Sequence, residues 1–129
     1  MLSVMIRIQI SLILSALFTL SQVHAGEVTV TAVGDIMLSG SYRPVIDRYG
    51  YSFPFEATSG ILTGSQIAVG NLELPITDRG REFTGKRFRF RSAPAAGKAL
   101  RKAGFSVLTL ANNHILDYGA DGLMDTLQY

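Results

Sequence analysis

The sequence contains no cysteine, only two histidines, and no apolar run long enough to cross a bilayer. Without cysteine the chain forms no disulfides, so an exported form must rely on its apolar core for stability. The longest apolar stretch, Ile8 to Leu20, is shorter than the ~20 residues that a transmembrane helix needs. Internal repeats, low-complexity tracts and linkers are also lacking, and the length of 129 residues allows one domain at most.

The beginning of the chain has the pattern of a secretory signal peptide over residues 1–25. Arg7 precedes the apolar stretch, and Val23-His24-Ala25 offers small residues at the two positions that signal cleavage requires. We expect cleavage after Ala25 and export to the periplasm or cell exterior, associated with the envelope; an uncleaved anchor is the alternative. Removal of residues 1–25 takes away Arg7 and His24 and leaves a nearly neutral chain in which His114 is the only histidine.

Hydrophobic periodicity predicts an α/β fold for the remainder. The expected strands cover 27–33, 66–70, 86–91 and 105–110, and the expected helices cover 42–49, 55–62, 95–103 and a last segment that starts near Asp121. The strand at 86–91 is predicted because arginine and phenylalanine alternate there with a period of two. Since strands alternate with helices, the sheet should be mainly parallel.

Polar side chains follow three of the predicted strands. In open α/β sheets ligands bind outside the carboxyl ends of the strands, and Asn, His, Asp and Glu are metal ligands or proton carriers. The repetition therefore predicts one shared site. Taken singly, each group also fits a turn or a helix cap, and the third fits an Asx turn. The residues concerned are Asp35, then Asn71 and Glu73, then Asn112, Asn113, His114 and Asp117.

Positive charge is concentrated between Arg79 and Lys102, where nine basic residues accompany a single acid, Glu82. On the predicted strand Arg87, Arg89 and Arg91 would share one face. Such a face suits phosphate or a carboxylate polymer, because a guanidinium pairs a carboxylate through two parallel hydrogen bonds. The alternative is a solvated surface. Export and the nearly neutral charge argue against nucleic acid as a partner.

Four segments together resemble the CapA family of capsule-synthesis proteins, which is linked to poly-γ-glutamate production. They are AVGDIMLSG at 32–40, GNLELPIT at 70–77, KRFRFRSAP at 86–94 and GFSVLTLANNHILDYGADGLMDTL at 104–127. The resemblance covers nearly all of 26–129 but only the amino-terminal part of such a domain. The helical pattern at 122–129 also stops without a cap. We therefore expect the chain to be a truncated portion of a CapA-like domain.

This resemblance implies the fold of calcineurin-like metallophosphoesterases, an αββα sandwich of two sheets with a pair of divalent metal ions at the strand ends. Met37 stands where those enzymes place a histidine ligand, and their later histidines have no counterpart here, so the implied site has few ligands. The implied roles are metal binding for Asp35, Asn71, Glu73 and Asn113 and catalysis at the scissile group for His114. Asp117 would either support the catalytic site as an acid behind its ligands or organise the loop.

Three functions stay open on the sequence. The first is a metal-dependent hydrolase or transferase of an envelope phosphoester or of poly-γ-glutamate. The second is a non-catalytic component of capsule export, with capsule-synthesis membrane proteins as candidate partners. It would bind an anionic polymer such as poly-γ-glutamate through Arg87, Arg89 and Arg91, helped by Arg79, Arg81 and Lys86. The third is a truncated product without independent activity.

Overall fold

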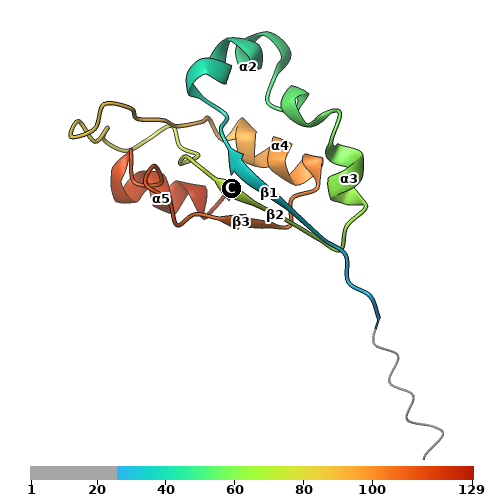
Figure 1. Ribbon diagram of the computed structural model, residues 1–129. Helices are drawn as coiled ribbons and strands as arrows, with labels where there is room; N and C mark the ends of the chain where they lie inside the picture. Colours follow the sequence, from blue (N-terminus) through green and yellow to red (C-terminus); the bar gives the residue numbers. More distant parts are fainter. Residues whose placement is uncertain (1–25) are drawn as a thin grey trace, which may run out of the picture.

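A computed structural model describes residues 26–129, which form a three-stranded parallel sheet and the helices around it (Figure 1). The strands, in sheet order, are β1 (Val30–Ile36), β2 (Ile67–Leu72) and β3 (Val107–Thr109). The helices are α2 (Arg43–Tyr49), α3 (Ser59–Thr63), α4 (Ala95–Ala103) and α5 (Gly119–Thr126), with single 3-10 turns η1 (Gly40–Tyr42) and η2 (Phe53–Phe55).

The prediction of an α/β fold with parallel strands is confirmed. One sheet is formed within 26–129, so the second sheet of the implied sandwich stays a prediction. The proposed signal peptide at 1–25 lies outside the described residues. Between 26 and 129, no helix combines the length and the apolar character that crossing a membrane requires.

The strands are displaced from their predicted bounds, and this displacement matters for the site. β1 begins and ends three residues later than expected, and β2 extends two residues beyond position 70. Asp35 and Asn71 therefore lie inside strands, near their carboxyl ends. The register pairs Asp35 with Asn71 and Asn71 with Thr109, after an irregularity between Ala32 and Asp35 in β1. These side chains thus share one row across the sheet.

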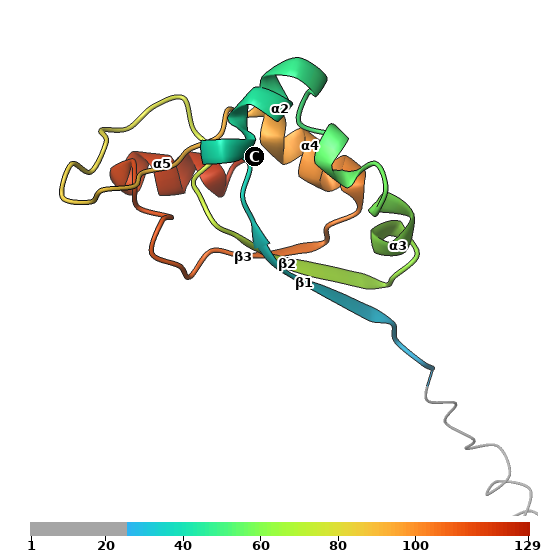
Figure 2. The same cartoon turned by 45° about the horizontal axis from the view of Figure 1, so that its top comes forward.

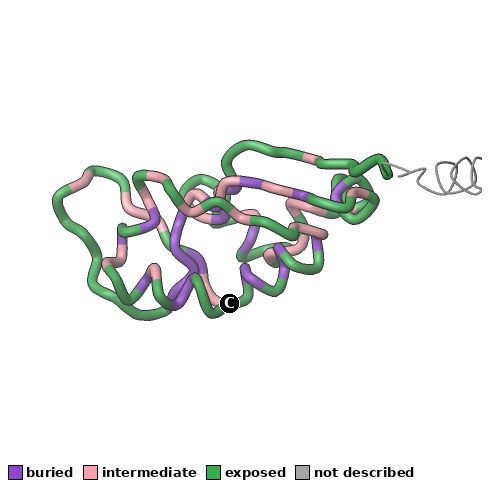
Figure 3. Tube along the Cα trace, turned by 90° about the horizontal axis from the view of Figure 1, so that it is seen from below, coloured by how far each residue is buried: buried purple, intermediate pink, exposed green. Residues whose placement is uncertain are grey.

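The apolar core lies between the sheet and the helices, which gather on one side of the strands (Figure 2). Helix α4 begins directly after Pro94 and presents a face of small and apolar residues. Of these, Ala96 and Leu100 pack with Leu72 of β2, and Ala103 packs with Ala68. The buried segments form the interior of the trace in Figure 3. The buried residues of α4 are three or four positions apart, which places them on one face of the helix.

The other face of the sheet is open within residues 26–129. Val30, Ile67 and Val107 lie on it with exposed fractions of 56%, 38% and 46%. Apolar β-branched side chains are typical of strands that are covered on both faces. The exposed face is thus apolar next to the polar row formed by Asp35, Asn71 and Thr109.

Residues 86–91 do not form a strand, so that prediction is wrong. Arginine and phenylalanine do alternate in this segment. The backbone, however, forms hydrogen bonds with side chains and not with a neighbouring strand. The N–H of Phe90 donates to the Asp117 carboxylate at 2.9 Å, and the carbonyl of Lys86 accepts from Arg89. The segment is consequently a loop fixed by side chains, with Phe88 and Phe90 stacked at 6.4 Å between ring centroids.

Gly104 caps the carboxyl end of helix α4, and this position requires glycine. Its φ is +109°, and an added Cβ would lie 2.8 Å from the backbone nitrogen of Thr63 in α3. We predict that Gly104→Ala lowers the free energy of unfolding by more than about 1 kcal/mol, because both the backbone angle and the contact oppose it. Urea denaturation followed by circular dichroism measures this effect.

Gly60→Ala is the matched control, because Gly60 is an exposed residue of α3 with no atom within 4 Å of an added Cβ. It should leave stability unchanged or raise it by up to about 1 kcal/mol, the difference in helix propensity. Equal losses in the two variants would show that the close approach of α3 and α4 is wrong.

Candidate functional site

A polar network occupies the carboxyl ends of the strands, and Asn71 is at its centre. The amide nitrogen of Asn71 donates to Asp35 Oδ1 at 2.8 Å and to Glu73 Oε2 at 2.6 Å. The amide oxygen of Asn71 accepts from Asn112 Nδ2 at 3.0 Å and from Thr109 Oγ1 at 3.3 Å. The structure therefore brings together three of the four residues that the resemblance assigned to metal.

Asn112 organises this network; the sequence predicted it in the shared site but indicated no particular role for it. Its side-chain oxygen accepts from the N–H of His114 at 2.9 Å and of Ile115 at 3.0 Å. Its amide nitrogen donates to the carbonyl of Leu72 at 2.8 Å. The Asx turn that the sequence allowed for residues 112–117 is thus present at Asn112. The available signal was an asparagine in the loop just after β3, two residues before a histidine.

A second cluster is built around the buried carboxylate of Asp117, whose side chain is 0% exposed. Its Oδ2 lies 2.6 Å from His114 Nδ1 and accepts from the N–H of Phe90 at 2.9 Å. Its Oδ1 accepts from Lys86 Nζ at 2.6 Å, and the same ammonium group donates to the carbonyl of Asn113. His114 and Asp117 were predicted to act together, whereas the contribution of Lys86 to the pair was missed.

The surroundings of Asp117 keep it ionised. Burial raises the pKa of the Asp117 carboxyl, but the hydrogen bonds from Lys86, His114 and the Phe90 N–H, with the charge of His114, outweigh burial and leave the pKa below its usual 3.8. An ionised carboxylate only accepts hydrogen bonds, so Nδ1 of His114 carries a proton. His114 Nε2 is then the ring atom that can take up or release a proton. The ring also packs on Phe90, at 4.8 Å between centroids.

Two residues from the resemblance lie apart from these clusters. The side chain of Asn113 is exposed and forms no hydrogen bond within residues 26–129. Met37, which replaces a histidine ligand, packs against the apolar core. Between 26 and 129, no three His, Cys, Asp or Glu side chains converge as a set of metal ligands. The residues present do not fit a centre of two divalent ions, because the amide nitrogen of Asn71 faces the two carboxylates that would have to hold them.

The basic segment divides into paired and unpaired arginines. Arg89 Nε donates to Glu82 at 2.8 Å, and Arg79 pairs with Asp125 of α5. Within residues 79–91, the three other arginines are exposed and have no carboxylate within 4.0 Å among residues 26–129. Two of these three stack on rings, at 5.1 Å and 4.5 Å from guanidinium carbon to ring centroid. The three are Arg81, Arg87 above Phe88, and Arg91 above Tyr118.

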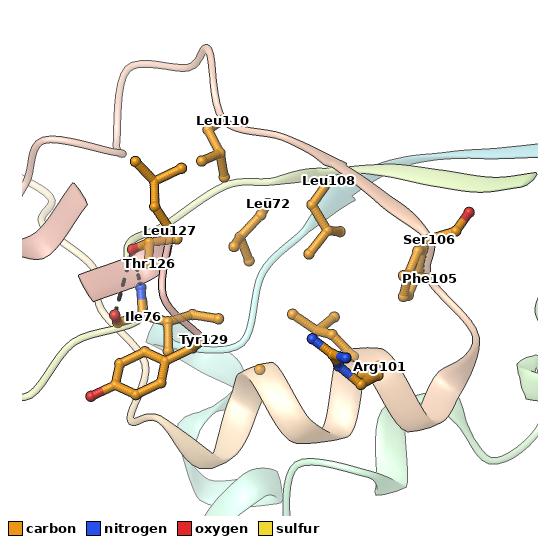
Figure 4. A pocket seen from close by; sticks show the side chains of 12 residues that line it. Leu72, Ile76, Arg101, Phe105, Ser106, Leu108, Leu110, Thr126, Leu127 and Tyr129 are labelled. Atoms are coloured by element: carbon orange, nitrogen blue, oxygen red, sulfur yellow. Dashed lines mark hydrogen bonds between the residues drawn. The ribbon is translucent and has the colours of Figure 1, made fainter. Parts of the chain in front are cut away.

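Two pockets are lined in part by residues of the strands. A pocket of about 370 Å³ borders Asp35, and apolar side chains such as Met37 and Phe55 line most of its wall. A larger one, of about 460 Å³, lies between β3, α4 and the end of α5, and its wall is also mainly apolar. Figure 4 shows its side chains, among them Leu72, Leu108, Leu110, Leu127, Tyr129 and Arg101.

Comparison with known proteins gives a consistent result. Residues 29–129 match the family described as "Bacterial capsule synthesis protein PGA_cap". The chain is 36% identical over 105 residues to the capsule biosynthesis protein CapA of Bacillus anthracis. The aligned region covers 79% of this chain and 26% of that protein. The chain is 33% identical over 96 residues to the PGA biosynthesis protein CapA of Bacillus subtilis, covering 74% and 25%. The chain spans about a quarter of the length of these relatives.

The Asp117 cluster predicts a specific dependence of stability on pH. Because the pKa of Asp117 is lowered by folding, its contribution is present at neutral pH and disappears as the pH falls below about 3.8, through the folded pKa. Asp117→Asn should cost about 3 kcal/mol at pH 7, since it leaves Lys86 without its buried partner. The difference from wild type should shrink on acidification, measured by urea denaturation at several pH values.

Asp121→Asn is the matched control, because Asp121 is an exposed acid of α5 with no ion pair among residues 26–129. It should change stability by less than about 0.5 kcal/mol at any pH. A loss in Asp117→Asn that is the same at pH 7 and at pH 3 would contradict the ionised, hydrogen-bonded carboxylate.

Proposed function

Because the chain belongs to the bacterial capsule synthesis protein family PGA_cap, we propose that it binds the anionic polymer of a capsule, such as poly-γ-glutamate, during synthesis or export. The observation that carries this proposal is the set of exposed arginines on the loop 79–91 that have no carboxylate partner among residues 26–129. We further propose that the protein is exported and works at the cell envelope, alongside capsule-synthesis membrane proteins.

The chemistry of the loop suits a polymer of carboxylates. Guanidinium groups pair carboxylates through two parallel hydrogen bonds, and such pairs weaken as salt is added. Arg87 and Arg91 are held over aromatic rings, so less side-chain entropy is lost when they bind. Arg89 was expected to share this role, but its pairing with Glu82 makes it a support for the loop in this proposal.

A second candidate function is hydrolysis of the bound polymer, in which water adds to an amide carbonyl and His114 gives a proton to the leaving amide nitrogen. The contact of 2.6 Å between His114 Nδ1 and Asp117 favours it, because an ionised carboxylate behind a histidine orients the ring and supports a proton at Nε2. The arginine loop meets this pair through Lys86 and Phe90, so a polymer on the loop would lie beside the histidine. No step is assigned to metal, since the residues present do not fit a two-ion centre.

The arginine proposal predicts salt-sensitive binding of poly-γ-glutamate. Replacing Arg87 and Arg91 together by glutamine should weaken binding roughly tenfold, since each exposed pair contributes up to about 1 kcal/mol and 1.4 kcal/mol corresponds to a factor of ten. Fluorescence anisotropy of labelled polymer with the full chain, at low and high NaCl, measures this. Chelators should not alter the wild-type affinity.

The matched control replaces Arg48 and Lys98 by glutamine. Both are exposed and outside the loop, and Arg48 also stacks on a ring, that of Tyr49 at 5.1 Å. The double control removes the same charge and should keep wild-type affinity. Binding that is absent in the wild type, or reduced equally in both double variants, would rule out the loop as the polymer site.

The proton-transfer candidate predicts that His114→Ala abolishes shortening or transfer of the polymer with little loss of fold. The change removes the ring contact with Phe90 and one of the three hydrogen bonds to the buried Asp117 carboxylate, so stability falls while Lys86 and the Phe90 N–H still hold the carboxylate in the folded chain. Polymer length is followed by size-exclusion chromatography, and circular dichroism checks the fold. Unchanged turnover in His114→Ala would refute the catalytic assignment while leaving polymer binding intact.

A further inference from the structure

The orientation of Asn112 is fixed by backbone groups, and this is the starting point of the inference. Two backbone N–H groups, of His114 and Ile115, point at one atom of its amide, which must therefore be the oxygen. The carbonyl of Leu72 faces the other atom, which must be the nitrogen. The assignment of oxygen and nitrogen in this side chain thus rests on groups whose donor or acceptor character is fixed.

The orientation of Asn71 follows from that of Asn112. Because Asn112 presents its NH₂ group at 3.0 Å, the facing atom of Asn71 is the oxygen. The nitrogen of Asn71 is left facing Asp35 Oδ1 at 2.8 Å and Glu73 Oε2 at 2.6 Å. Each N–H of this amide has one carboxylate oxygen as acceptor, so all four hydrogen-bonding directions of the Asn71 amide are used consistently.

The nitrogen of Asn71 thereby occupies the point on which the two carboxylates converge. Calcium in proteins lies 2.3–2.6 Å from its oxygen ligands, and magnesium and zinc lie closer. A cation shared by Asp35 and Glu73 would need nearly the same position. An amide NH₂ is a donor that coordinates no cation, so it competes with a metal for this place.

We propose that the Asn71 amide is a neutral bridge that holds Asp35 and Glu73 together in place of a cation, and that Asn71→Asp converts the trio into a divalent-cation site. A third carboxylate would remove both N–H donors and add an oxygen ligand and a negative charge. Affinity for cations rises with the number of charged ligands. This inference concerns the strand ends and does not depend on polymer binding by the loop.

The test is a calorimetric titration of the full chain with Mn²⁺, supported by thermal melting with Mn²⁺ or with EDTA. Wild type should show no saturable site at the strand ends and the same melting temperature in both solutions. Asn71→Asp should melt lower than wild type in EDTA and recover with Mn²⁺. Its Mn²⁺ affinity should exceed that of wild type at least about tenfold, given the range over which ligand charge tunes such sites.

Gln128→Glu is the matched control, because it adds the same charge at an exposed position just after α5, at a residue with no assigned role in the site. An equal gain in Gln128→Glu would overturn the inference, since net charge would then explain the affinity. Stoichiometric binding of Mn²⁺ to wild type that is lost in Asp35→Asn and in Glu73→Gln would overturn it as well. This wild-type titration decides the question even if Asn71→Asp does not fold.

Discussion

The buried carboxylate of Asp117 is the constraint on which the rest of the site depends. A charge taken out of water needs partners, and here Lys86, His114 and the N–H of Phe90 supply them. Two of the three come from the loop 79–91, which has no regular secondary structure of its own. The carbonyl of Asp117 also accepts from the N–H of Phe83 at 2.8 Å. One residue therefore fixes both the histidine and the arginine loop.

The strand ends depend on a different principle, the pairing of amides with carboxylates. Parallel register sets Asp35, Asn71 and Thr109 in one row, and Asn112 closes the row from the loop after β3. The carboxylates of Asp35 and Glu73 are bridged by the Asn71 amide, whose hydrogen-bond donors carry no net charge. This arrangement satisfies two neighbouring carboxylates with side chains of the chain itself, which distinguishes it from a set of metal ligands that all present oxygen.

The sequence predicted the parts of the site that follow from strand order and missed those that follow from long-range partners. Asp35, Asn71 and Glu73 were expected together because parallel strands end at one edge, and they are together. The strand at 86–91 was predicted from local alternation alone. The N–H of Phe90 instead donates to a carboxylate 27 residues away in the sequence. The periodicity of a sequence does not indicate such a long-range contact.

The same limit applies to charges. A run of basic residues shows how many arginines there are, but not that Arg79 and Arg89 are occupied by Asp125 and Glu82. The roles of Lys86 and Asn112 were hidden for the same reason, since each acts on residues brought near only by folding. The family was accessible from the sequence, because its motifs are local strings and the match over 29–129 agrees with them.

Native-state hydrogen exchange at the backbone amide of Phe90 tests the central claim most directly. This amide donates to Asp117, whereas the amide of Arg87, in the same loop, has no acceptor among residues 26–129. The account predicts that Phe90 exchanges far more slowly than Arg87, at a rate close to that of amides in β2. Equally fast exchange at both positions would show that Asp117 does not hold the loop, and the link between the arginines and His114 would be lost.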